Sequence, residues 1–450
     1  MPDTYKTKED HEALAPVPSQ NGEVATSTHD AVFGAITEDG PNYRNVGWIG
    51  TSIIMMKTQI GLGVLSIPAA FDILGMVPGV ICMMIIAALT TWGAYVIGPF
   101  KLKHPEIYGI DDAAGLVFGR VGRELLSIGF VLFLIFCAGS GMLGISIGLN
   151  AVSTHGSCTA VFVAVSAVIV IMFASIRTLS RISFLAWVGL VAILTAIMIV
   201  TIAVGVQDRP HDAPAGPWSS DYKIVNNPSF TDGVSAIATF VFAYAGSPFY
   251  FPIVAEMRDH RDYSKALFLC QGVVTLTYLV IGIVVYYYCG SYVASPALGS
   301  AGPLLKKIGY GIALPGLIVS STLSTHVKLA SKHFFVRILR GSKHLVANTL
   351  IHWATWLGCV CSVAIVAYCI ASGIPVFGGL APCGFDNWKQ GKVRPSPKWM
   401  LQVVVSVIMI VGGTFLMVGG TYGSVVGIID SYKADGGSKA WSCADNSNSV

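Results

Sequence analysis

Long apolar stretches recur along most of this chain, and they constrain its fold more than any other feature of the sequence. Several are longer than the roughly 18 uncharged apolar residues that mark a membrane-spanning helix. Charged residues make up only 12% of the chain, whereas soluble domains carry about 25%. The sequence therefore predicts an all-α polytopic membrane protein that sits in a lipid bilayer.

Polar segments divide these stretches into predicted spans and two tails. Residues 1–45 are rich in Pro, Ser, Thr and acidic residues, so we expect a disordered tail there. The transmembrane domain would occupy 46–429, and a polar C-terminal tail would occupy 430–450. The predicted spans are 46–74, 77–98, 125–150, 160–176, 182–206, 233–257, 266–289, 309–329, 350–373 and 400–420.

One apolar stretch, Thr51–Phe71, contains residues that an ordinary spanning helix disfavours. A lysine such as Lys57 costs about 2.5–3.5 kcal/mol at a helix centre on insertion scales. Gly61 and Gly63 each lower helix propensity by about 1 kcal/mol, and Pro68 lacks a backbone donor. Such breaks persist in membranes only where they line a cavity or are buried in protein. We therefore predict a discontinuous first span that forms half of a substrate site.

A second span, Gly233–Met257, is interrupted in a comparable place by Ala245-Gly246-Ser247-Pro248. The two broken spans stand five apart and run in opposite directions, which indicates an inverted five-plus-five repeat with substrate bound at the midplane. The repeats would comprise residues 46–206 and 233–385. Half-helix ends offer N–H groups to an anion and C=O groups to a cation, and an amino acid zwitterion carries both charges. Two proline kinks in ordinary helices are the alternative.

The distribution of Lys and Arg predicts a cytoplasmic amino terminus, because loops rich in these residues face the cytoplasm. Four Lys and Arg residues lie in loops after odd-numbered spans, namely Arg209, Lys223, Lys306 and Lys307. Thirteen lie in loops after even-numbered spans and in the link after span six: Lys101, Lys103, Arg120, Arg123, Arg177, Arg181, Arg258, Arg261, Lys265, Lys332, Arg337, Arg340 and Lys343. The plasma membrane is the expected location of the protein.

Three motifs resemble the amino acid/auxin permease family. Lys57–Pro68 is similar to the first-helix signature of that family. Ala243-Tyr244-Ala245-Gly246, followed by Glu256–Asp259, resembles its sixth helix. Ser324-Thr325-His326, followed by Phe335–Arg340, resembles its eighth helix and the next loop. The resemblance covers 31–380 and 386–429 and is closest to the fungal neutral amino acid permeases.

That resemblance implies a secondary active transporter with eleven spans around a LeuT-like inverted-repeat core. It implies import of neutral (aliphatic or aromatic) amino acids by proton symport, with sodium as the coupling ion in some branches of the family. The chain departs from the pattern at Gly378–Trp388, and only Ile374–Phe385, twelve residues, remains of the tenth span. A helix of that length reaches about 18 Å, short of the ~30 Å hydrocarbon core. The tenth span is therefore predicted to be truncated. A non-transporting relative, or an amino acid-sensing membrane protein on the same scaffold, is the alternative function.

The two breaks supply the predicted substrate site. Gly61, Leu62 and Gly63 are candidates for holding the substrate carboxylate through backbone amides, in agreement with the resemblance; a packing notch is the alternative. Ala245, Gly246 and Ser247 would meet the amine or the side chain from the other half. Tyr244 would line the pocket or serve as a packing tyrosine.

Other polar residues suggest gating and ion coupling. Lys57 is expected to form a gating or structural ion pair with Glu256, or to extend its amine to the cytoplasmic face. An ordinary cytoplasmic helix end is the alternative for Glu256. Thr325 matches the position of an ion ligand in the sodium-coupled branch. His326 titrates in the range suited to proton coupling; a hydrogen-bonded packing histidine is its alternative.

Cys158 and Cys289 are both expected to face outside. They could form one disulfide, as in related animal transporters of the family; two buried thiols are the alternative.

Other classes of protein fit the sequence less well. A receptor with seven spans is disfavoured by the ten predicted here. A membrane-embedded enzyme would need clustered catalytic groups, and the histidines from His326 to His352 are too loosely spaced. No C-x-x-C pair occurs, so no zinc or redox site is expected. No metal, organic cofactor or nucleic-acid partner is predicted; the coupling ion would be H⁺ or Na⁺, and no oligomeric state is assigned.

Overall fold

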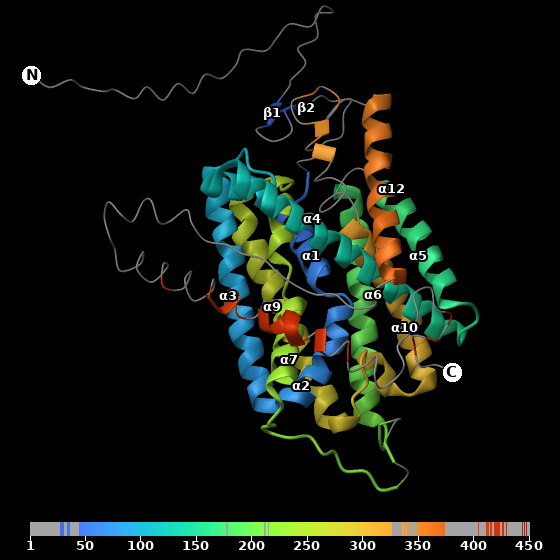
Figure 1. The fold of residues 1–450 in the computed structure, drawn as a ribbon. Coiled ribbons are helices and arrows are strands. Elements are labelled where there is room, and N and C mark those ends of the chain that lie inside the picture. The colour runs from blue at the N-terminus through green and yellow to red at the C-terminus, as the bar shows by residue number, and fades with distance from the viewer. Residues whose placement is uncertain are drawn as a thin grey trace, which may run out of the picture.

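The computed structural model describes residues 28–30, 34–36, 45–176, 179–210, 213–214, 216–325 and 350–373, with scattered positions between 335 and 349 and between 404 and 447. Most of these residues form a bundle of long helices (Figure 1). The α-helices are α1 (Trp48–Gln59), α2 (Ile67–Leu74), α3 (Met76–Lys103), α4 (Ile110–Ser153), α5 (Thr159–Ala174), α6 (Leu179–Val206), α7 (Phe230–Ala243), α8 (Tyr250–Ala255), α9 (Tyr263–Cys289), α10 (Pro303–Thr325) and α12 (Leu350–Gly373). Short 3₁₀ helices are η1 (Leu62–Ser66), η2 (Ser247–Phe249), η3 (His260–Asp262), η4 (Gly290–Tyr292) and η5 (Ala297–Ala301).

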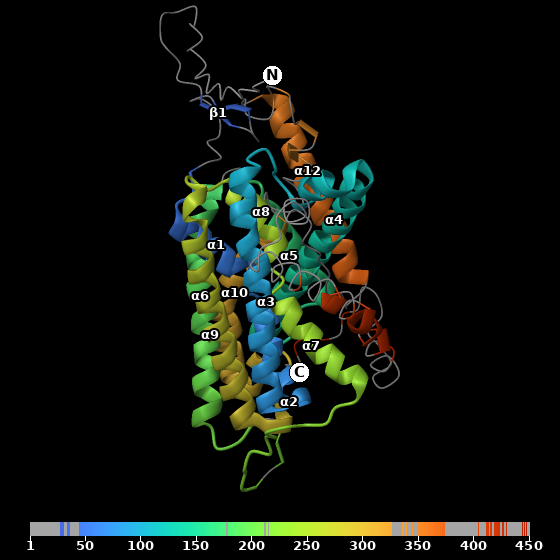
Figure 2. The ribbon, with the colours of Figure 1, turned by 90° about the vertical axis from the view of Figure 1, so that its left-hand side faces the viewer.

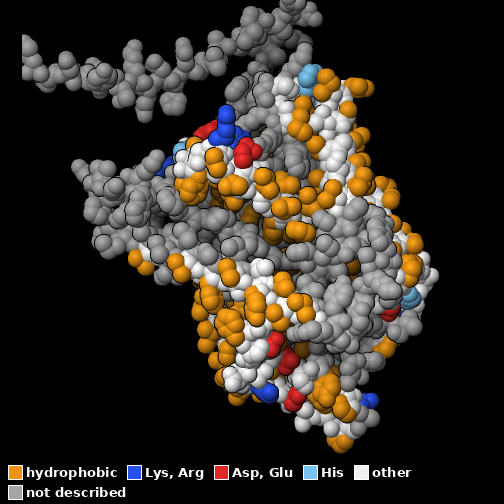
Figure 3. Space-filling view, viewed as in Figure 1, with side chains coloured by type: hydrophobic (Ala, Val, Ile, Leu, Met, Phe, Trp, Pro, Cys, Tyr) orange, Lys and Arg blue, Asp and Glu red, His pale blue; other side chains and the backbone are white. Residues whose placement is uncertain are grey.

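Seven helical segments in the described part of the chain are long and apolar enough to cross a membrane, and the bent pair α1 and α2 raises the number to eight. The shorter apolar helix α5 has 16 residues. On the face seen in Figure 3, apolar side chains cover much of the described surface, and most of the charged side chains gather toward its upper and lower ends. The prediction of a polytopic helical membrane protein is confirmed.

Both predicted breaks are present. The first separates α1 from α2, which are bent by 46° and joined through η1. The second separates α7 from α8, with η2 between them. Pro68 and Pro248 each lie in the first turn of the segment that follows the break. A proline is tolerated there because first-turn N–H groups have no partner within the helix. The helices therefore end and restart, which differs from a proline kink inside a continuous helix.

The intact helices hold the broken ones in place. α1 packs on α9 and α6, while α2 packs on α7 and α9. α10 contacts both α4 and α6 extensively, and Figure 2 shows α3 and α9 running alongside the broken spans. Close approach of α4 to α10 requires a glycine at position 141, since a Cβ there would lie 2.8 Å from Cβ of Ser321. α4 is also interrupted at Gly119, whose φ of +67° suits glycine.

Of the predictions for the two ends of the chain, the one for the N-terminal tail needs correction, and the one for the tenth span lies outside the described residues. Residues 28–36 belong to the predicted disordered tail, yet β1 (Thr28–Asp30) pairs antiparallel with β2 (Gly34–Ile36). The composition of the tail as a whole does not reveal this pairing, because it involves only three residues in each strand, THD and GAI. The predicted truncation at Ile374–Phe385 lies outside the described residues, as does most of 400–420.

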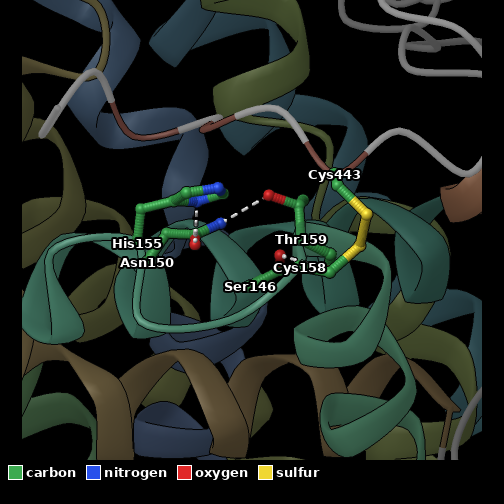
Figure 4. The surroundings of a disulfide bond; sticks show 6 residues. All are labelled: Ser146, Asn150, His155, Cys158, Thr159 and Cys443. Atoms are coloured by element: carbon green, nitrogen blue, oxygen red, sulfur yellow. Dashed lines mark hydrogen bonds between the residues drawn. A yellow bond between two sulfur atoms is a disulfide. The ribbon is translucent and has the colours of Figure 1, made fainter.

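The predicted disulfide has the wrong partner. Cys158, at the start of α5, bonds to Cys443 (Figure 4). Cys289 is a free, fully buried thiol at the end of α9. The Cys289 side chain is thus packed inside the protein, and Cys158 bonds instead to a cysteine of the C-terminal tail. Beside the disulfide, Asn150 Nδ2 donates to Thr159 Oγ1 at 2.8 Å and Asn150 Oδ1 lies 3.1 Å from Nδ1 of His155.

Candidate functional site

A cavity of about 90 Å³ lies between the two broken spans. A single water needs about 10–15 Å³ on this measure, so the cavity has room for roughly six to nine water-sized groups, comparable with the heavy atoms of a small amino acid. Both breaks, α4 and α10 contribute its walls. The lining residues are Lys57, Thr58, Gln59, Gly61, Gly63, Phe133, Cys137, Ser140, Gly141, Phe242, Ala243, Ala245, Phe249, Leu317, Ser320, Leu323 and Ser324.

The structure brings three of the predicted substrate residues together around this cavity, namely Gly61, Gly63 and Ala245. Leu62 lies between the two glycines as the first residue of η1. Bonding roles for these residues stay predictions, because their place on the wall gives proximity and no ligand contact.

Three other predicted residues lie behind the wall. Tyr244 is fully buried, and its hydroxyl donates to Thr275 Oγ1 of α9 at 3.1 Å. Gly246 packs on the Gln59 side chain, where an added Cβ would lie 2.7 Å from Cγ. Ser247 begins η2 and is not among the described residues that line the cavity. These three residues therefore pack around the second break and do not line the cavity.

Lys57 projects into the bundle and makes two hydrogen bonds at the first break. Its amine donates to the Ile60 carbonyl oxygen at 2.8 Å and to Ser320 Oγ of α10 at 2.5 Å. The side chain is 1% exposed, so it does not extend to the membrane face. Gly189 of α6 makes room for it, since a Cβ there would lie 3.1 Å from Cε of Lys57. The amine thus ties the break to the neighbouring intact helix.

The predicted Lys57–Glu256 ion pair does not form between these two described residues. Glu256 lies at the end of α8, next to the strand-like contact of Val46 with Met257. That contact lies just before the start of α1, and Lys57 lies nine residues after the first residue of α1. Nine residues of α-helix rise about 14 Å, which is too far for a salt bridge.

A second polar cluster surrounds Gln59, at the end of α1 beside the first break. Gln59 Nε2 donates to the Tyr250 hydroxyl of α8 and lies 3.9 Å from the Cys270 thiol of α9. Tyr278 of α9 is fully buried, and its hydroxyl donates to the Gln59 carbonyl at 3.0 Å and to the Ala243 carbonyl at 2.9 Å. Tyr250 and Tyr278 were not among the residues predicted from the sequence. Their only sequence signal is a polar tip on a residue within an apolar span.

α10 presents hydroxyl groups in two directions. Ser320 and Ser324 line the cavity. Ser321 and Thr322 are buried elsewhere, and neither hydroxyl has a hydrogen-bond partner among the described residues. Thr325, one of the predicted coupling residues, is buried as the last residue of α10 and does not line the cavity. His326 lies outside the described residues.

Helix ends of opposite polarity meet at the cavity. η1 begins beside Gly61, and the first N–H groups of a helical segment have no partner within it. α7 ends at Ala243 on the other side, where the Phe242 and Ala243 carbonyls accept the Ala245 N–H and the Tyr278 hydroxyl and each keeps a second lone pair. This arrangement can receive an anionic and a cationic group together. The described residues contain no cluster of His, Cys, Asp and Glu suited to a metal ion.

Comparison with known proteins identifies the family. The family described as "Transmembrane amino acid transporter protein" matches residues 44–383, about three quarters of the chain. The chain belongs to this family.

Fungal relatives of this transporter-family protein align over most of their length. A "Transmembrane transporter" of Gibberella moniliformis is 34% identical, over 96% of this chain and 97% of that protein. An "N amino acid transport system protein" of Neurospora crassa is 35% identical, over 84% of this chain and 82% of that protein. The alignment with the Gibberella protein counts 469 positions, more than the 450 residues of this chain. It therefore includes residues of that relative that have no counterpart in this chain.

A solved structure confirms the predicted LeuT-like fold. It is the outward-open, substrate-bound state of a Na⁺-coupled sialic acid symporter, with a TM-score of 0.54 over 88% of this chain and 86% of that one. The two proteins share 13% sequence identity, so the likeness concerns the fold alone. This transporter-family protein is thus a multi-pass membrane protein with broken helices at the positions where its cavity lies.

Proposed function

We propose that this chain is a secondary active transporter that imports neutral amino acids by proton symport. The observation that carries the proposal is the cavity at which η1 begins and α7 ends. The start of η1 suits a carboxylate and the end of α7 suits an amine, so the backbone of an amino acid can be recognised without charged side chains. Membership of an amino acid transporter family supports the same substrate class.

Aromatic groups favour a neutral substrate side chain. Phe133 of α4 stacks on Phe249 of η2 with ring centroids 5.5 Å apart, and both rings line the cavity with Phe242. Among the described lining residues there is no carboxylate to pair with a cationic side chain. Aliphatic and aromatic side chains would bury apolar area against these rings, at about 25 cal/mol per Å².

Proton coupling and orientation draw on two further observations. The amine of Lys57 lies in the cavity wall, where a change in its protonation would change the field acting on a bound zwitterion. Thr325 and His326 stay proposed participants in coupling. The Cys158–Cys443 disulfide lies beyond the end of α4, and disulfides persist in oxidising compartments. A plasma-membrane protein with a cytoplasmic amino terminus would place it outside.

A non-transporting relative is the second candidate. The observation that favours it is the short segment Ile374–Phe385, together with the residues of the Gibberella relative that face gaps in this chain. A second repeat that lacks a full helix would disturb the symmetry on which alternating access depends.

Uptake of radiolabelled neutral amino acids in a transport-deficient yeast tests the proposal. We expect uptake that a proton uncoupler abolishes and that excess unlabelled neutral amino acid competes away. Lysine and glutamate should compete poorly. A Gly63→Leu variant, which places a bulky side chain toward Phe242, is the matched negative control. Absence of uptake for every amino acid at normal surface expression would favour the non-transporting relative.

A further inference from the structure

One side chain contacts both broken spans. Tyr278 lies in the middle of α9, on neither broken span, and is fully buried. Its hydroxyl lies 3.0 Å from the carbonyl oxygen of Gln59 and 2.9 Å from that of Ala243. Gln59 is the last residue of α1 and Ala243 is the last residue of α7. The hydroxyl therefore bridges the C-terminal ends of the two helices that precede the breaks.

Carbonyls at the ends of these helices take donors from outside the helix: the Gln59 carbonyl accepts the Gly61 N–H at 3.0 Å, and the Gln59 and Ala243 carbonyls both accept the Tyr278 hydroxyl. The last four carbonyl groups of a helix have no partner within it. In a bilayer there is no water in the hydrocarbon region to satisfy them. The Tyr278 hydroxyl serves one such group from each repeat. A phenol carries a single proton, so the two carbonyls share one donor.

Neighbouring contacts fix the Tyr278 ring in this position. The Tyr244 ring packs edge-on against it with centroids 5.0 Å apart. Tyr244 in turn bonds through its hydroxyl to Thr275, one turn before Tyr278 on α9. Both tyrosines thus attach the second break to α9, while Tyr278 alone of the two also reaches the first break.

We propose that Tyr278 is a positioning residue that couples the two breaks by holding their helix ends on one shared donor. Its hydroxyl keeps the walls of the cavity in the register that binds substrate. A change at one break would then alter how firmly the other is held. The transport consequences rest on the proposed function, whereas the structural coupling does not.

Tyr278→Phe removes one oxygen and leaves the ring in place, so the variant keeps the shape of the core. Hydrogen exchange of the full-length protein in detergent reports on both breaks without any transport measurement. A net hydrogen bond contributes about 1 kcal/mol, which corresponds to roughly a fivefold change in local opening. We expect exchange to rise by about that factor in peptides covering 57–66 and in peptides covering 240–250.

Tyr263→Phe is the matched control. It removes a buried hydroxyl from the same helix, where it donates to the Ala94 carbonyl of α3 at 2.8 Å. We expect it to change exchange in α3 and to leave both break peptides unchanged. An increase confined to one break peptide in Tyr278→Phe, or no increase in either, would overturn the proposal.

Transport adds a readout that a packing role would not move. We expect KM for a neutral amino acid to rise about fivefold in Tyr278→Phe, because the binding-competent register is less populated. The maximal rate per molecule at the surface should change by less than about twofold, since the loss is one hydrogen bond in the bound state. If the wild-type chain transports nothing, the proposed function fails and the exchange result still decides the coupling. If it transports and KM stays unchanged, the positioning role is wrong.

Discussion

Lys57 is the residue on which the first break depends most directly. Its buried amine holds the Ile60 carbonyl at the break and the Ser320 hydroxyl of α10 at once. Hydrogen bonds from a charged group contribute about 1.5–3 kcal/mol, and a partner left unsatisfied in the interior costs as much again. These hydrogen bonds therefore offset part of the free-energy cost of placing a lysine inside the membrane.

Lys57→Met keeps an unbranched apolar side chain and removes the amine. We expect initial uptake per surface molecule to fall at least tenfold, because both hydrogen bonds are lost. Ser320→Ala should give a smaller decrease, and the double variant should resemble Lys57→Met alone. Lys265→Met is the control, since that amine is exposed and pairs with Asp262, which immediately precedes α9. Wild-type uptake by Lys57→Met would contradict this account.

At the residue scale, the sequence predicted the positions of the cavity residues better than it predicted their hydrogen-bond partners. Polar and small residues inside apolar spans led to Gly61, Gly63 and Ala245, and these residues do lie together. The partner of Lys57 could not be predicted, because Ser320 lies 263 positions away and only helix packing brings it close. Tyr278 was missed for the same reason. Its role depends on two backbone carbonyls, and backbone groups leave no trace in the sequence.

At the scale of helices, the cavity depends on how closely α4 approaches α10. Gly141 lies on the cavity wall, and a Cβ there would come within 3.0 Å of the Ser321 backbone. Ser321 cannot relieve this contact by a change of rotamer alone. The position therefore sets the distance between two helices that form one side of the site.

Gly141→Ala should lower the thermal stability of the detergent-solubilised protein, since overpacking of this kind typically costs about 1–3 kcal/mol. Gly129→Ala is the matched control on the same helix, because a Cβ there meets nothing within 4 Å. That change should be neutral or stabilise slightly, by up to about 1 kcal/mol of helix propensity. Equal melting temperatures for the two variants would show that the α4–α10 contact adapts freely.

The positions of the breaks were predictable to within a few residues. Glycine and proline carry their conformational limits in their own covalent structure, so a break near Gly61–Gly63 and another near Ala245–Pro248 followed from the sequence. The observed helices end at Gln59 and Ala243. The pairing of β1 with β2 was not predictable from the composition of the whole tail, because three residues in each strand suffice to form it.

At the scale of the whole molecule, the disulfide joins the loop after α4 to the C-terminal tail, and its cysteine pairing can be tested. We expect denatured, unreduced wild-type protein to gain two maleimide labels on reduction, from Cys158 and Cys443. Single Cys158→Ser and Cys443→Ser variants should gain none. Cys289→Ser should still gain two, since that thiol is free. Loss of the gain in Cys289→Ser would restore the pairing predicted from the sequence.

The same bond tests the number of membrane crossings. The broken first span, α3 and α4 cross in alternating directions, so the loop that follows α4 lies opposite the start of α1. Cys443 shares that face because it bonds to Cys158. An odd number of crossings must therefore separate the start of α1 from Cys443, whereas ten complete spans would give an even number. We expect an epitope tag after residue 450 to be accessible in intact cells, and a tag before residue 1 only after permeabilisation. Tags that both need permeabilisation would favour the even count and place the two cysteines on opposite faces.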